Sequence, residues 1–112
     1  MPDKKLPDKK LPDKKLPDKK FTDEQHVISS KKGNGILRRE VWIDDKGNVT
    51  RYNLAYINLS LFSDDNGRII GFDNAHGYHH RHYFGKVEAL TFTSFEATEL
   101  LFEQAWLALR SQ

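Results

Sequence analysis

Hydrophobic residues between positions 36 and 84 cluster in short runs that are rich in β-branched and aromatic side chains. Runs of this kind, bounded by turn residues, are typical of β-strands. We therefore predict four strands, over residues 36–43, 49–62, 68–73 and 79–84. The second run leaves little polar surface, which indicates a central or bulged strand. Residues 21–35 show no clear period and predict only a loop at 31–35.

Polar segments with turn chemistry separate the predicted strands. Residues 44–48, Asp-Asp-Lys-Gly-Asn, lie between the first strand and the second. Asp64-Asp65-Asn66-Gly67 lies between the second and the third, and Asn-Gly readily adopts the positive φ values of a type I′ turn. We therefore predict a tight hairpin at Asn66-Gly67.

The spacing of hydrophobic residues becomes helical after residue 92. Thr93 and Glu96 have the spacing of a capping box with Thr93 as the N-cap. The predicted apolar stripe is Phe95, Phe102, Ala105, Trp106 and Leu109, broadened by Leu101 and Ala108. The expected core of the sheet includes Trp42, Tyr52 and Tyr56. These patterns predict an α+β fold, in which a small antiparallel β-sheet of about four strands is covered by a C-terminal amphipathic helix.

The first twenty residues repeat a Pro-Asp-Lys-Lys-Leu unit. Leucines five positions apart do not share a face of a helix or a strand, and a proline in each unit opposes a helix. We predict a disordered arm over residues 1–20 and a single domain over residues 21–112. The arm has 8 Lys and 4 Asp, so the other 92 residues have a net charge of −2 within the total of +2. The arm is either a tolerated tail or a cationic segment that attracts nucleic acid.

Composition excludes several classes of protein. The chain has no cysteine, which rules out a disulfide scaffold and a thiolate zinc site. It also lacks an apolar run of about 18 residues and the apolar segment of a secretory signal. We therefore expect a cytoplasmic protein with no membrane partner.

Four of the five histidines lie within residues 76–82. On a strand, His80 and His82 point to one face, whereas Arg81 and Tyr83 point to the other. Two imidazoles on one face supply a general base and a general acid. RNA cleavage needs both, because one group takes the proton of the ribose 2′-hydroxyl and the other protonates the departing 5′-oxygen. A carboxylate fixes an imidazole tautomer, and a cation stabilises charge on phosphorus. The predicted catalytic residues are His80, His82, Asp73 and Arg81.

Neighbouring side chains supply candidate contacts to RNA. Cations stabilise the phosphate, and aromatic rings stack on bases. The substrate-binding residues predicted on this basis are Arg68, Lys86, Tyr78 and Tyr83.

A metal site is a second interpretation of the histidine segment. His-x-His also chelates metals, and His76, His80 and His82 with Asp73 could complete a metal site. We favour acid–base chemistry, because no acidic residue follows His82 closely in the sequence.

Several candidates could also have purely structural roles. Asp73 and Asn74 are residues that form turns by bonding backbone amides through their side chains. Arg68 could be a surface residue of its strand, and His76 and His79 could lie in an exposed loop.

The run from Arg68 to Asp73 ends in Gly-Phe-Asp-Asn and is followed by Gly77 and then by His80-Arg81-His82. This order resembles the signature of the TumE family of small toxins from toxin–antitoxin systems. The segment 88–94 and the terminal helix fit the same pattern, so the resemblance covers residues 36–110. His76, His79 and the repeated arm lie outside it.

The resemblance implies a toxin paired with a DNA-binding antitoxin that a neighbouring gene encodes. It adds Asn74 to the substrate-binding candidates. Together with the histidine pair it predicts metal-independent cleavage of RNA, with RNA as the substrate and no cofactor. Two further functions stay open, a non-enzymatic nucleic-acid-binding or regulatory module and a histidine-ligated metal enzyme.

Overall fold

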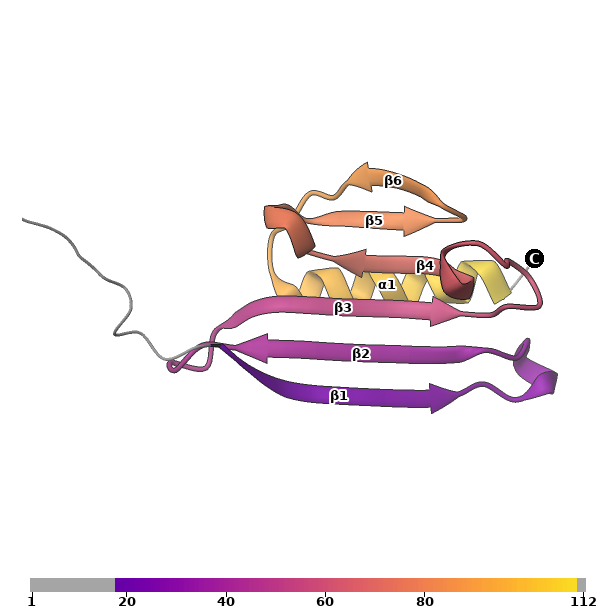
Figure 1. The fold of residues 1–112 in the computed structure, drawn as a ribbon, viewed down its shortest axis with the longest axis horizontal. Helices are drawn as coiled ribbons and strands as arrows, with labels where there is room; N and C mark the ends of the chain where they lie inside the picture. The colour runs from indigo at the N-terminus through magenta and orange to yellow at the C-terminus, as the bar shows by residue number, and fades with distance from the viewer. Residues whose placement is uncertain (1–17, 111–112) are drawn as a thin grey trace, which may run out of the picture.

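The computed structural model describes residues 18–110, which form one antiparallel sheet and one long helix. The six strands of the sheet lie side by side in sequence order. They are β1 (Lys19–Val27), β2 (Ile36–Ile43), β3 (Val49–Ile57), β4 (Arg68–Asp73), β5 (His80–Tyr83) and β6 (Lys86–Ala89), and the helix is α1 (Phe95–Arg110). Figure 1 shows α1 lying across the back of β3 and β4. The predicted α+β class is confirmed, but the sheet has two strands more than the four predicted.

The two strands that the sequence did not predict, β1 and β6, form the edges of the sheet. Eight of the nine residues of β1 are exposed, and so are all four of β6. A strand that is exposed on both faces leaves no alternation of hydrophobic and polar residues, so it gives no pattern to detect.

β1 begins at Lys19, inside the segment predicted to be a disordered arm. The rest of that prediction falls on residues 1–17, which lie outside the described part of the chain. Between residues 18 and 110, no helix has both the length and the hydropathy that crossing a membrane requires.

Asn58 ends β3 earlier than predicted. Its Nδ2 donates to the carbonyl oxygen of Gly33 at 3.0 Å, and its Oδ1 accepts a hydrogen bond from the Ser60 N–H at 3.0 Å. Residues 58–67 then form a long connection, so the predicted tight hairpin is wrong. Asn66 and Gly67 do have positive φ values, 55° and 83°, but they end this connection.

One face of the sheet packs against α1. The centroids of Phe72 on β4 and Phe102 on α1 lie 5.7 Å apart, in an edge-to-face arrangement. The predicted helix stripe is confirmed for Phe95, Phe102, Ala105, Trp106 and Leu109, which all belong to or pack against the core. The predicted broadening by Leu101 and Ala108 is wrong, because both are exposed. The described helix covers only this face, and we call the opposite one the open face (Figure 1).

Ser94, rather than the predicted Thr93, is the N-cap of α1. The helix begins at Phe95, and Ser94 Oγ accepts a hydrogen bond from the Ala97 N–H at 3.1 Å. The Ser94 carbonyl oxygen accepts the next one, from the Thr98 N–H, also at 3.1 Å. The helix is confirmed, but its capping residue lies one position later than predicted.

Candidate functional site

Cross-strand pairing aligns a row of polar residues on the open face. The row runs from Glu40 on β2 through Asn53 on β3 and Asp73 on β4 to His80 on β5. His82 lies in the adjacent row, opposite Gly71. The prediction that His80 and His82 share a face is therefore confirmed, and this face also carries Asp73.

The Asp73 carboxylate contacts both of these histidines. Its Oδ1 lies 2.9 Å from His80 Nε2, and its Oδ2 lies 3.4 Å from His82 Nε2. Oδ1 also accepts a hydrogen bond from the Ala75 N–H at 3.0 Å, so the turn role considered for Asp73 is present as well. Asp73 is 6% exposed and His80 4%. A single buried carboxylate thus orients two imidazoles.

The ring nitrogens of the two histidines have different partners. His80 Nδ1 lies 3.0 Å from the Tyr78 carbonyl oxygen, and its Nε2 faces the Asp73 carboxylate. Both ring nitrogens of His80 therefore face oxygen acceptors. His82 Nδ1 lies 3.2 Å from Arg68 Nη2, and a guanidinium can only donate. His82 Nδ1 therefore accepts, and the proton of this ring is on Nε2.

Arg68 reaches the open face through a β-bulge. Tyr56 pairs with Ile70 whereas Ile57 pairs with Arg68, so Ile69 is an extra residue in β4. The bulge turns Arg68 toward Asp73, whose Oδ2 lies 3.4 Å from Arg68 Nη1. Arg68 therefore belongs to the cluster that it forms with Asp73, His80 and His82, which we call the Asp–His cluster.

Burial and charge together lower the pKa of His82 from its ordinary value of 6.5. Burial is the larger cause, because an imidazolium loses its hydration, and the charge of Arg68 adds to it. The neutral form of His82 therefore persists to lower pH than that of a free histidine. The side chains of His82 and Arg68 are 13% and 24% exposed, which makes them the accessible members of the cluster.

Asn74 and Tyr78, two of the predicted substrate-binding residues, lie beside the cluster. Asn74 Oδ1 accepts a hydrogen bond from the Tyr52 N–H, and its Nδ2 donates to the Thr50 carbonyl oxygen, each at 3.0 Å. The side chain of Asn74 thus extends the pairing of β3 with β4. The half-exposed ring of Tyr78 packs against His80, with 4.6 Å between centroids.

Arg81, Tyr83 and Lys86 lie on the helix side of the sheet, away from the Asp–His cluster. Arg81 Nε is 3.0 Å from Glu88 Oε1, in an ion pair without hydrogen-bond geometry. Tyr83 packs against the hydrophobic core, and Lys86 pairs with Tyr83 at the start of β6. Strand alternation therefore separates these three predicted residues from the two histidines.

His79 also lies on the helix side, and its predicted position in an exposed loop is wrong. Its ring stacks on Phe92 with 3.8 Å between centroids, and its Nδ1 lies 2.9 Å from the Tyr52 hydroxyl. Burial raises the pKa of Tyr52 to about 12, so this hydroxyl keeps its proton. Burial lowers the pKa of His79. His76 is exposed in the loop, as predicted.

Asp73, His80 and His82 could also hold a metal ion. Each offers one ligand atom, and these atoms lie within 4.8 Å of one another. Two histidines and a carboxylate suit several transition metals. Arg68 opposes binding, because it holds the His82 proton on Nε2, the nitrogen that would have to be free to bind the metal. His76, the fourth residue of the predicted metal set, does not belong to this group.

No family model, curated protein or solved structure matches this chain. Its surface offers a different guide to a ligand, since a hollow of about 340 Å³ opens beside Asp73 and Arg68. Trp42 and Arg51 also line this hollow. Trp42 was predicted in the core, but it is half-buried on the open face, because it alternates in phase with Glu40 along β2. That phase was visible in the sequence, whereas nothing in the sequence singled out Arg51.

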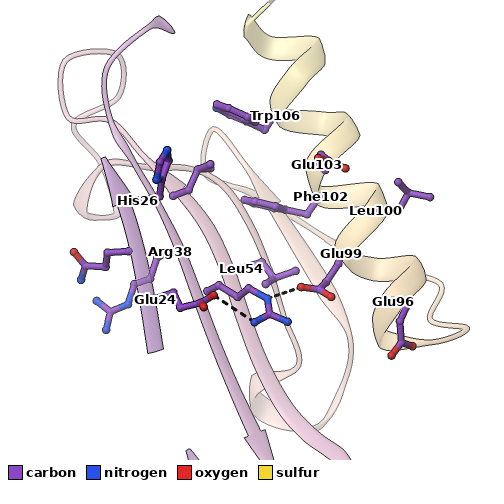
Figure 2. A pocket seen from close by; sticks show the side chains of 13 residues that line it. Glu24, His26, Arg38, Leu54, Glu96, Glu99, Leu100, Phe102, Glu103 and Trp106 are labelled. Atoms are coloured by element: carbon purple, nitrogen blue, oxygen red, sulfur yellow. Dashed lines mark hydrogen bonds and ion pairs between the residues drawn. The ribbon is translucent and has the colours of Figure 1, made fainter. Parts of the chain in front are cut away.

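A larger hollow, of about 810 Å³, lies on the helix side of the sheet between α1 and strands β1 and β2. Arg39 forms ion pairs with Glu24 of β1 and Glu99 of α1, two lining residues that Figure 2 labels. Its apolar lining includes Leu37, Leu54, Leu100, Phe102 and Trp106. No member of the Asp–His cluster lines this hollow.

Proposed function

We propose that this protein is the toxin component of a prokaryotic toxin–antitoxin system and that it cleaves RNA by acid–base catalysis without a metal ion. The observation that carries the proposal is the contact of one buried carboxylate, Asp73, with two imidazoles and a guanidinium. The resemblance of residues 68–82 to the TumE signature supports the toxin role, because Asp73 and both histidines belong to that signature. The partner is then an antitoxin encoded nearby, and the protein acts in the cytoplasm.

In the proposed reaction the ribose 2′-oxygen attacks the adjacent phosphorus while the bond from phosphorus to the 5′-oxygen breaks. His82 is neutral and takes the 2′-hydroxyl proton, and the imidazolium of His80 protonates the departing 5′-oxygen. The products are a 2′,3′-cyclic phosphate and a 5′-hydroxyl. Each proton transfer contributes a factor of about 10²–10⁴ to the rate. Since His80 is nearly fully buried, we expect Tyr78, which packs against it, to move aside when RNA binds.

Arg68 supplies the positive charge in this mechanism. Without substrate, it donates a hydrogen bond to His82 Nδ1. A phosphate oxygen is a stronger acceptor, so RNA draws the guanidinium away and leaves Nδ1 free to accept the 2′-hydroxyl proton. The guanidinium then stabilises the charge that develops on the phosphoryl oxygens. A fixed cation at this place provides what a metal ion provides in other phosphoryl-transfer enzymes.

Induced expression in a bacterial host tests the toxin role. Wild type should arrest growth, and co-expression of the neighbouring gene should restore it. The double variant His80→Ala/His82→Ala, at matched protein level, should not arrest growth. If both proteins arrest growth, the acid–base assignment is wrong and the toxin role survives. If wild type never arrests growth, the toxin role is wrong.

Cleavage of RNA by the purified protein tests the reaction. Wild type should cleave in the presence of a chelator and leave 2′,3′-cyclic phosphate ends, and a 2′-deoxy nucleotide at the cleavage site should block the reaction. His76→Ala is a matched control, because this histidine is exposed in the loop and outside the cluster. Tight binding of RNA without cleavage would favour the non-enzymatic nucleic-acid-binding module instead.

A histidine-ligated metal enzyme is the second candidate, and the convergence of Asp73, His80 and His82 favours it. This candidate requires that a chelator abolishes cleavage and that a divalent metal restores it. It also requires that Arg68→Ala strengthens metal binding, since the guanidinium holds a proton on a would-be ligand nitrogen. In the metal-free mechanism, Arg68→Ala abolishes cleavage with or without metal.

A further inference from the structure

Trp42 and Arg51 form a stacked pair on the open face. They are directly opposite each other on β2 and β3, and the guanidinium carbon of Arg51 lies 4.6 Å from the centroid of the Trp42 ring. Lys20 Nζ lies 5.1 Å from the same centroid. Trp42 is not a member of the hydrophobic core, so the pair is a surface feature.

The charge of Arg51 is available to an anion. Within residues 18–110, no carboxylate forms an ion pair with Arg51. Its side chain is exposed, and the indole of Trp42 supports its guanidinium. Arg68, by contrast, pairs with Asp65 and Asp73. A guanidinium stacked on an aromatic ring loses less freedom on binding a phosphate than a free one, because its plane is already oriented.

The stacked pair and two members of the Asp–His cluster, Arg68 and Asp73, line one cavity. The hollow has a volume of about 340 Å³, and Trp42 and Arg51 lie in its wall together with Arg68. Glu40 also lines it, but ion pairs with Lys20 and Arg38 compensate its charge. A ligand that fills the hollow therefore meets two guanidinium groups, those of Arg51 and Arg68.

We infer that Trp42 and Arg51 form a nucleotide-binding subsite for single-stranded RNA, next to the phosphate on which His82 and Arg68 act. The base stacks on the guanidinium that Trp42 supports, and the guanidinium edge donates to a phosphate oxygen. Unpaired bases reach a sheet surface in this way, whereas those of an A-form duplex are enclosed in its deep groove. The placement next to the reacting phosphate rests on the proposed function, but the binding itself does not.

Tryptophan fluorescence of the full chain tests the subsite. The chain has two tryptophans, so Trp106→Phe leaves Trp42 as the only indole. An unpaired RNA octamer with 2′-O-methyl riboses should quench this fluorescence saturably, because it binds but lacks the attacking hydroxyl. Arg51→Gln should weaken its binding roughly tenfold, the order of one lost base stack. The affinity of Arg51→Lys should lie between those of wild type and Arg51→Gln, because lysine keeps the charge but lacks the planar guanidinium.

Arg110→Gln is the matched control. Arg110 is likewise stacked on a tryptophan, with its guanidinium carbon 4.9 Å from the Trp106 centroid, but on α1. It should bind the octamer as tightly as wild type, measured by anisotropy of a labelled strand. Equal affinities of Arg51→Gln and Arg110→Gln, at equal melting temperatures, would overturn the subsite.

Two further ligands separate the remaining possibilities. A hairpin of the same length in paired nucleotides should bind more weakly than the octamer, and equal binding would overturn the assignment to single strands. A DNA octamer that binds as tightly as the RNA would overturn the assignment to RNA. A protein that binds RNA through Arg51 but never cleaves unmodified RNA would support the subsite and refute the proposed ribonuclease.

Discussion

Gly71 lies directly beneath the side chain of Arg68. A Cβ atom on Gly71 would be 2.6 Å from Arg68 Cδ and 3.2 Å from its Nε, closer than side chains tolerate. Gly71 is not among the residues with positive φ, so it is needed for space and not for an unusual backbone conformation. The glycine of the Gly-Phe-Asp-Asn run thus gives Arg68 its path to Asp73 and His82.

Gly71→Ala should therefore displace Arg68 without unfolding the protein. With the guanidinium farther away, the pKa of His82 should rise, because the charge of Arg68 is one of the causes that lower it. NMR titration of the His82 ring measures this directly, and Arg68→Gln should shift the pKa in the same direction. A rise in Arg68→Gln but not in Gly71→Ala would show that Gly71 does not set the position of Arg68.

Asp73 and Asp65 give a matched pair of substitutions, because both carboxylates contact Arg68. The Asp73 side chain is 9% exposed and that of Asp65 34%. Asp73→Asn removes the buried charge that Arg68 and both histidines contact and should lower the free energy of unfolding by about 3 kcal/mol. Asp65→Asn should lower it by less than about 1 kcal/mol, as for exposed ion pairs. Urea denaturation checks both, and equal losses would contradict the burial of Asp73.

Acid should destabilise the fold through His79 and His82. The pKa of each is lower in the folded protein than the ordinary 6.5 of an unfolded chain. The unfolded chain therefore binds more protons, so stability is complete above pH 6.5 and is lost as pH falls through the folded pKa values. Free energies of unfolding measured between about pH 7.5 and about pH 4.5 should show this decline. His79→Gln should make the decline shallower, and an unchanged slope would remove His79 from this account.

The start of α1 can be located by two alanine substitutions. Ser94→Ala removes the hydroxyl that accepts the Ala97 N–H and should cost about 1 kcal/mol of stability. Thr93→Ala should cost much less, since Thr93 is outside the helix and does not cap it. Thermal unfolding of the two variants gives the comparison, and a larger loss for Thr93→Ala would restore the predicted capping box.

The elements that the sequence predicts well are those whose burial is one-sided. α1 has a periodic stripe, so its existence and its packing face follow from spacing alone. β1 is exposed on both faces and therefore has no periodic pattern of hydrophobic residues. The end of β3 depends on the side-chain bonds of Asn58 to distant backbone, and no local pattern contains that information. Trp42 was predicted in the core from its hydrophobic character alone. Its position along β2 places it on the same face as Glu40 and Arg38, which is the open face.

The candidate site divides in the same way. His80, His82 and Asp73 come together because strand alternation and an adjacent strand pair bring them to one face, and both follow from sequence. Alternation also separates Arg81 from them. The inclusion of Arg68 depends on a bulge, and that of Arg51 on the pairing of β3 with β2. Bulges and registers are set by contacts between strands, so a single sequence does not reveal them.

The bulge at Ile69 makes the site depend on the length of β4 as well as on its residues. If β4 alternated regularly from Asp73 and Gly71, Ile69 would lie on the open face and Arg68 would point to the helix side of the sheet. Because of the bulge, Ile69 is instead fully buried in the core, and Arg68 lies opposite Ile57 on the open face. One extra residue thus exchanges the sides of Ile69 and Arg68, which gives the core an isoleucine and the cluster its guanidinium.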